Sequence, residues 1–167
     1  MCGMSAELDT VLNADPMALL TPEEQEAVRV EKLEQIAAEV INGSRSTVDL
    51  EYTLYKGNAK RERTIRMTVR VPDMDDEANI ERLMAMMANG LPMLALTPEA
   101  QETFKARALF EVCAVAPFED WVPLTKEPID YKGVKAVRPD FSRFPGPRKI
   151  WLQTLYGEYE EVANRFQ

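Results

Sequence analysis

The side chains that most often carry chemistry are scarce in this sequence. Its 167 residues include no histidine and only two cysteines. Histidine is the commonest metal ligand and the usual group for proton transfer near neutral pH. Its absence excludes Ser-His-Asp and Cys-His triads, HExxH zinc sites and two-histidine iron sites. We therefore predict no catalytic residues, no metal site and no cofactor, and a protein that acts through its surfaces.

The acidic run DMDDE at 73–77 is the nearest approach to a metal site. An EF-hand loop that begins at Asp73 needs glycine at its sixth position and glutamate at its twelfth. This chain has Ala78 and Met84 at those positions. Acidic residues also stabilise the start of a helix, because they face the positive end of its dipole. We predict that the run caps a helix.

Two other candidates for chemistry have simpler interpretations. Glu119 and Asp120, next to Trp121, could supply one carboxylate of a hydrolytic pair, but nothing places a second carboxylate at catalytic distance. We expect an exposed loop there. Cys113 lies in an apolar helical run without a histidine partner, so we expect an inert thiol. A disulfide to Cys2 stays open as an alternative, although a reduced chain is the simpler interpretation.

The segment 122–149 differs from the rest of the chain in charge. It carries seven cations and three anions, a net charge of +4, whereas residues 1–47 carry a net charge of -6. Basic residues interleaved with aromatic ones can bind single-stranded nucleic acid. The two oppositely charged regions can instead satisfy each other, within one chain or between neighbouring copies. We favour protein docking or self-packing, and keep a nucleic-acid-associated regulator as the alternative function.

The expected partner-binding residues come from this segment and from a methionine-rich helix. Five of the nine methionines lie within 74–93, and thioether side chains form adaptable surfaces. Met86 lies off the apolar stripe of its helix. Together with the aromatic residues near the basic segment, it gives the predicted set: Met86, Trp121, Tyr131, Phe141, Phe144 and Trp151. Each of these side chains is equally consistent with ordinary packing.

Helical spacing and capping residues predict the elements that must position these side chains. Thr21, Pro22 and Glu24 form a capping box ahead of a helix over 22–41. Further helices are expected over 76–89, 98–116 and 148–166. The helix over 98–116 is apolar on most sides, so it is the expected centre of the core.

Two runs with alternating polarity, 48–55 and 63–71, predict a β-hairpin around the turn residues 56–58. An antiparallel register that joins their apolar faces also places Asp49 and Glu51 opposite Arg66, Thr68 and Arg70. Such cross-strand pairs of opposite charge stabilise a hairpin by about 0.2–1 kcal/mol each.

The expected fold is α+β: one mostly helical domain with an antiparallel β-hairpin. We divide the chain into a helical domain (1–116, hairpin at 48–71), an extended proline-rich basic arm (117–149) and a C-terminal helix (150–167) that packs on the domain or on a partner. Net charge is -8, which argues against general binding to nucleic acid or anionic membranes. No signal-peptide pattern opens the chain and no apolar run is long enough to span a membrane, so we expect a cytoplasmic protein.

The layout resembles small proteins of tailed-phage tail modules, namely tail assembly chaperones and baseplate or tail adaptors. The resemblance covers about 48–166 and is carried by the hairpin VDLEYTLYKGNAKRERTIRMTVRVP, the helix ending ARALFEVCAVAPFEDWV and the final PGPRKIWLQTLYGEYEEVANRF. It implies a non-enzymatic protein that binds other tail or assembly proteins, in the host cytoplasm or in the virion. A homo-oligomer also stays open.

Overall fold

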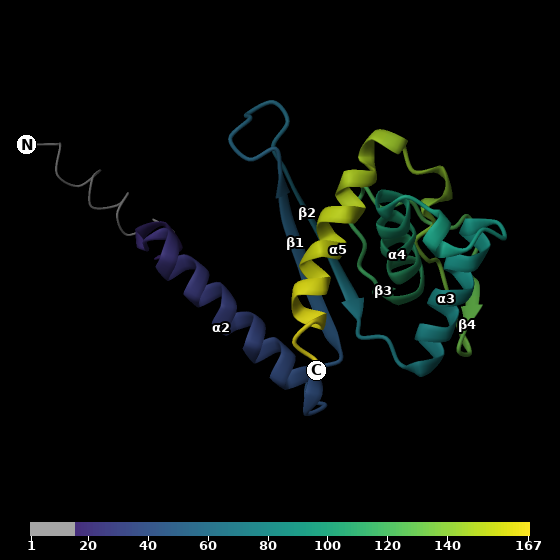
Figure 1. Ribbon diagram of the computed structural model, residues 1–167, viewed down its shortest axis with the longest axis horizontal. Coiled ribbons are helices and arrows are strands. Elements are labelled where there is room, and N and C mark those ends of the chain that lie inside the picture. Colours follow the sequence, from purple (N-terminus) through teal and green to yellow (C-terminus); the bar gives the residue numbers. More distant parts are fainter. Residues whose placement is uncertain (1–15) are drawn as a thin grey trace, which may run out of the picture.

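The computed structural model describes residues 16–167 and shows the expected mostly helical α+β fold (Figure 1). Its helices are α2 (Pro22–Ile41), α3 (Met74–Ala88), α4 (Pro98–Cys113) and α5 (Lys149–Ala163), with short 3₁₀ turns at Pro16–Leu19, Met93–Ala95, Phe141–Arg143 and Gly146–Arg148. Thr21 and Glu24 form the predicted capping box of α2. Asp73 caps α3 in the same way, with Asp76 at the third helical position. The prediction that the acidic run caps a helix is therefore confirmed.

The predicted hairpin is present as β1 (Thr47–Leu54) and β2 (Arg63–Arg70). Its register pairs Asp49 with Thr68 and Glu51 with Arg66, which is one of the registers that join the apolar faces of the two strands. The Arg66 guanidinium donates to Glu51 at 2.6 Å. Helix α4 is shorter than expected, because Ala114–Val115 leave it to form β3, which pairs with β2.

The core lies between the sheet and helices α4 and α5. Helix α5 packs along the β1–β2 hairpin, and α4 packs between α5 and α3 (Figure 1). The largest fully buried apolar side chains come from the sheet, from α4 and from α5: Phe110, Ile65, Leu152, Leu155, Val48 and Val69. The prediction that α4 is central to the core is confirmed, since Phe110 and Cys113 on this helix have no exposed surface.

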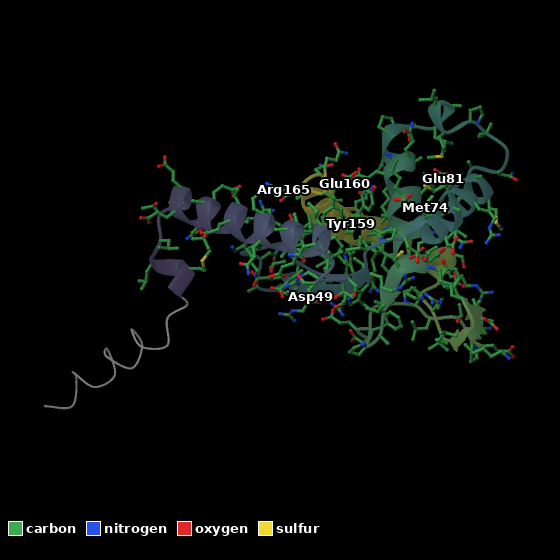
Figure 2. All side chains as sticks on the ribbon, turned by 90° about the horizontal axis from the view of Figure 1, so that it is seen from below. Asp49, Met74, Glu81, Tyr159, Glu160 and Arg165 are labelled. Atoms are coloured by element: carbon green, nitrogen blue, oxygen red, sulfur yellow. The ribbon has the colours of Figure 1, made fainter. Side chains whose placement is uncertain are left out.

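Helix α2 projects from this body (Figure 1). Its C-terminal half lies against α5, where Leu33 and Ile36 pack on the core and Arg165 donates to Glu34 at 2.9 Å. Figure 2 shows Arg165 close to α2, with Met74 and Glu81 on the far side of the molecule. Among residues 16–167, no helix combines the length and the apolar character that a membrane crossing requires.

The proline-rich arm, residues 117–149, packs on the domain. It contains a small hairpin, β4 (Ile129–Tyr131) and β5 (Val134–Ala136), within a segment that we expected to be an extended arm. The turn between these strands places Lys132 at a φ of 52° and Gly133 at 77°. Two consecutive positive φ values are what a two-residue hairpin turn of type I′ requires.

Candidate functional site

The six predicted partner-binding residues divide into two groups in space. Trp121, Phe141, Phe144 and Trp151 form one contiguous aromatic cluster, whereas Met86 and Tyr131 line a groove elsewhere. The two groups have different surroundings and need separate treatment.

The aromatic cluster belongs to the hydrophobic core. Trp121 and Trp151 meet edge to face with ring centroids 5.8 Å apart, and Phe141 and Phe144 do the same at 5.3 Å. Trp121, Phe141 and Trp151 are buried, and Phe144 is half-buried against them. This corrects our expectation for these residues: aromatic rings of this kind exclude water by packing on each other, so they hold the arm on the domain and are not exposed anchors for a partner.

The candidate groove lies between α3, the end of α4 and residues 124–140 of the arm. It has a volume of about 570 Å³. Its lining comes from α3 (Asn79, Arg82, Leu83, Met86), from α4 (Glu111, Val112) and from the arm (Thr125, Ile129, Tyr131, Arg138, Pro139, Asp140). Met86 is 69% exposed at this groove. The groove therefore combines exposed apolar surface with hydrogen-bonding side chains.

One wall of the groove is fixed by a network of charged side chains around Asp76, which has no exposed surface. The Asp76 carboxylate accepts hydrogen bonds from Arg70 at 2.6 Å and from the Tyr131 hydroxyl at 2.6 Å. The Lys132 ammonium lies 3.1 Å from the same carboxylate. We call Arg70, Asp73, Asp76, Tyr131 and Lys132 the Asp76 network. It ties β2, α3 and the small hairpin together.

The electrostatics of this network favour an ionised Asp76 at neutral pH. Burial alone would raise the pKa of its carboxyl, but the donors on Arg70, Tyr131, Lys132 and the Asp73 backbone hold that pKa well below the usual range. Burial raises the pKa of the Tyr131 hydroxyl, and its hydrogen bond to Asp76 raises it further. Tyr131 therefore stays a neutral donor at the lining of the groove.

Arg138 also holds lining residues of the groove in place. Its guanidinium lies 4.8 Å from the centroid of the Tyr131 ring and donates to the Val112 carbonyl at 3.0 Å. Asn79 donates to the Tyr131 hydroxyl at 3.0 Å. These contacts keep the lining side chains in place before any partner arrives, which lowers the entropy lost on binding.

The carboxylates of the groove are already engaged in holding the arm. Burial raises the pKa of Glu111, which accepts from the Phe141 backbone N–H at 2.8 Å and pairs with Arg107. The pKa of Asp140 is lowered by hydrogen bonds from Ser142. The arrangement is suited to binding a chain segment through apolar contacts and hydrogen bonds.

The other sequence-predicted candidates have structural contacts. Glu119 accepts from the Trp121 indole at 2.7 Å, and Asp120 pairs with Arg63 at 3.0 Å. Cys113 has no exposed surface, and burial raises the pKa of its thiol to about 12, which keeps it an unreactive thiol. Cys2 lies outside the described residues. Within residues 16–167, no group of three or more potential metal-ligating His, Cys, Asp or Glu side chains comes together.

The central role of Asp76 was not predictable from the sequence. The capping pattern from Asp73 to Asp76 was visible, but it gives no sign that the carboxylate is buried or that it bonds Tyr131, which is 55 residues further along the chain. Comparison with known proteins adds no assignment: no family model, curated protein or solved structure matches this chain.

Proposed function

We propose that this protein is a non-enzymatic adaptor or assembly chaperone of a tail-like particle, and that it binds a segment of another tail or assembly protein in the groove beside α3. The phage-tail setting rests on the resemblance of the hairpin and of the two helices quoted above. The observation that carries the binding role is the exposed Met86 beside a groove whose opposite wall is fixed by the Asp76 network.

The lining of the groove suits a peptide segment with apolar side chains. Met86, Leu83 and Ile129 offer apolar contacts, and methionine adapts its shape to different partners. Arg82 lies on the same face and can donate to backbone carbonyls of an extended or helical segment, whereas both amide hydrogens of Asn79 already bond Asp75 and Tyr131. Apolar anchors with a few fixed donors are the usual composition of a protein-binding groove.

The packing of the arm favours a protein partner over nucleic acid. Lys132 pairs with Asp73 and Asp76, Lys149 pairs with Glu99, and the Arg148 guanidinium lies over Trp151. The rings of Trp121 and Phe141, which would have to stack on bases, are buried. Single-stranded nucleic acid binds by stacking its bases on open aromatic faces, so the burial of these rings reduces the capacity of the arm for that role.

The test is a capture experiment on a native lysate treated with nuclease, using the tagged full chain and mass spectrometry. The key variant is Met86→Glu, which places a charge in the groove. The matched control is Met74→Glu, because Met74 is 86% exposed on the same helix and does not line the groove.

We expect the wild-type protein and Met74→Glu to retain the same structural proteins, and Met86→Glu to lose them. Burying an unpaired charge in an apolar interface costs several kcal/mol, so the loss should be at least about a hundredfold. Equal capture by all three proteins would contradict the groove as the binding site. Capture that nuclease abolishes would support the nucleic-acid alternative instead.

A further inference from the structure

Strand β1 forms an edge of the sheet, in which the strand order is β1–β2–β3, and it lies on the side toward α2 (Figure 1). The Val71 N–H donates to the Ser46 carbonyl at 2.8 Å, and the same register continues through the hairpin. In an antiparallel pair, residues that bond the partner strand alternate with residues whose backbone groups point away. The even-numbered residues of β1 therefore bond β2, and the odd-numbered residues direct their N–H and carbonyl groups outward: Thr47, Asp49, Glu51 and Thr53.

These outward backbone groups have no hydrogen-bond partner in the part of the chain that the structure describes. The far side of β2 is covered instead. It pairs with β3, and the outward N–H of Arg66 donates to the Glu119 carboxylate at 3.2 Å. Free N–H and carbonyl groups on an edge strand are a template for pairing with another extended chain. The fold thus covers one side of the hairpin and leaves the β1 edge open.

Helix α2 faces this open edge across a cleft. Two adjoining cavities of about 200 and 290 Å³ share Lys32, Ile36 and Asp49 in their linings. The larger set of lining residues includes Leu33 of α2 and Val162 of α5. We call these two cavities the α2–β1 cleft. The cleft sets apolar side chains beside unpaired backbone donors and acceptors, which is the arrangement that holds an added strand.

The charges on β1 argue against a second copy of β1 as the added strand. Every antiparallel register of β1 with itself that pairs at least three of the outward residues sets a carboxylate of Asp49 or Glu51 directly opposite another. Like charges in such positions destabilise a strand pair. Glu51 is paired with Arg66 at 2.6 Å, but Asp49 accepts only from the Thr68 hydroxyl and has no ion pair among residues 16–167.

We propose that the β1 edge binds an extended segment of a second protein, which adds to the sheet as an antiparallel strand between β1 and α2. Side chains alternate along a strand, so one side of the segment faces the cleft and favours apolar residues against Leu33, Ile36 and Val162. Lys32 can lay its methylene groups on these residues while its ammonium stays in water. The other side favours a basic residue opposite Asp49. The occupant is therefore a polypeptide in which apolar and basic residues alternate.

The probe is a synthetic peptide of 8 residues, as long as β1, that alternates valine and lysine. In the proposed pairing the lysines lie opposite the outward residues of β1, so their backbone N–H groups face β1 and those of the valines face away. Backbone N-methylation at the lysine positions removes the bonding N–H groups. Backbone N-methylation at the valine positions is the matched control, with the same charge and the same number of methyl groups.

The protein side of the test uses two substitutions at one position. Glu51→Pro removes an outward N–H of β1, and proline is tolerated on an edge strand where the N–H does not bond the neighbouring strand. Glu51→Ala is the matched control, because it loses the same side chain and keeps the N–H. Circular dichroism checks that both variants are folded, and the two methylated peptides test the same hydrogen bonds on the unaltered protein.

We expect the amides of Asp49, Glu51 and Thr53 to exchange rapidly in the free full chain and slowly with the peptide bound. The amides of Leu50 and Tyr52 should be protected in both states, because they already bond β2. Nuclear magnetic resonance measures this exchange, and titration calorimetry measures the affinity. Glu51→Pro should bind the peptide at least about tenfold more weakly than Glu51→Ala, and methylation at lysine should weaken binding similarly relative to methylation at valine.

Three results would overturn the proposal. The first is no gain of protection at the outward amides with excess peptide. The second is equal binding of the two methylated peptides, which would indicate simple attraction between a basic peptide and an acidic protein. The third is slow exchange of the outward amides in the free protein, which would show that the edge is already covered.

This site and the groove beside α3 share no lining residue. Met86→Glu should therefore bind the peptide like the wild type, and Glu51→Pro should still capture the partner of the groove. Failure of this proposal and failure of the proposed function are thus distinguishable.

Discussion

At the scale of single residues, Asp76 is the most consequential side chain in the molecule. It is a buried carboxylate with donors from β2, from its own helix cap and from the arm. A carboxylate in such surroundings is costly to bury and remains stable only because its donors are all in place. Its removal leaves Arg70 without a partner for its charge, so the residue controls whether the wall of the groove forms.

Asp76→Ala should destabilise the fold by about 3 kcal/mol, because removal of one partner from a buried ion pair leaves an uncompensated charge. Asp75→Ala is the matched control, since Asp75 is exposed in the same helical turn. Urea denaturation followed by circular dichroism measures both. A change of similar size in the two variants would contradict the central role of Asp76.

The Asp76 network also predicts an acid-dependent loss of stability. The pKa of Asp76 is lowered in the folded protein, so the unfolded chain takes up the proton first as pH falls. The stabilisation is therefore complete well above the ordinary carboxyl pKa and declines below about pH 4. Denaturation midpoints measured at a series of pH values should show this decline.

The control for the acid dependence is Asp76→Asn, which removes the titrating group. Its stability should depend less on pH over the acid range than that of the wild type, although it starts from a lower value at neutral pH. Parallel pH profiles for the two proteins would show that other carboxylates cause the decline.

At the scale of elements, the arm is held on the domain by its aromatic side chains. Trp121 contacts Phe141, Phe144 and Trp151. Trp121→Ala should therefore lower the free energy of unfolding by about 3–5 kcal/mol. Val134→Ala, on an exposed residue of the same arm, should have little effect. A folded, stable Trp121→Ala variant that loses only its partner would restore our original interpretation of this residue.

The two threonine caps predict a contrast between α2 and α4. Thr21 and Thr97 make equivalent cap hydrogen bonds at 3.2 Å, but α2 projects while α4 is buried in the core. Thr97→Ala should lower global stability by about 1 kcal/mol. Thr21→Ala should mainly speed amide exchange in the first turns of α2, because those turns can fray locally. Urea denaturation measures the global stability of the two variants, and hydrogen exchange measures the local opening of the first turns of α2. Equal losses of global stability in the two variants would contradict the projecting position of α2.

The elements that periodicity defines were predictable, and those set by long-range contacts were not. The alternation in 48–55 and 63–71 predicted which side chains face the core, because a slip by one residue would expose the apolar face. The exact pairing was not predictable, since a slip by two residues keeps the same faces. The strand Ala114–Val115 was missed because its two residues continue the apolar run of α4. The small hairpin had a local signal, Lys132-Gly133 between two short runs, which we missed because we expected the whole proline-rich segment to be extended.

The candidate site was predictable only in part. Met86 stood out because it lies off the apolar stripe of its helix. Tyr131 was named as a member of a basic and aromatic segment, but its hydrogen bond to Asp76 joins residues far apart in the sequence. Burial of Trp121 and Phe141 depends on how the arm folds back, which composition does not encode. The local sequence of the arm does not distinguish an aromatic residue that will be buried from one that will be exposed.

At the scale of the whole molecule, the charge is unevenly distributed. Residues 1–47 are acidic and residues 122–149 are basic within a chain of net charge -8, and the fold places helix α2 and strand β4, one from each region, at opposite ends of the described residues (Figure 1). The groove beside α3 and the acidic helix α2 are therefore separate parts of the surface.

The most direct test of the proposed function is photo-crosslinking from single positions on α3, in a nuclease-treated native lysate. The photoreactive residue replaces Met86 in the groove or, as the control, Met74 at the start of the same helix. We predict crosslinks from position 86 to a structural or assembly protein of the particle, and none to that protein from position 74. Equal crosslinking from both positions, or no protein crosslink from position 86, would contradict the groove as the docking site.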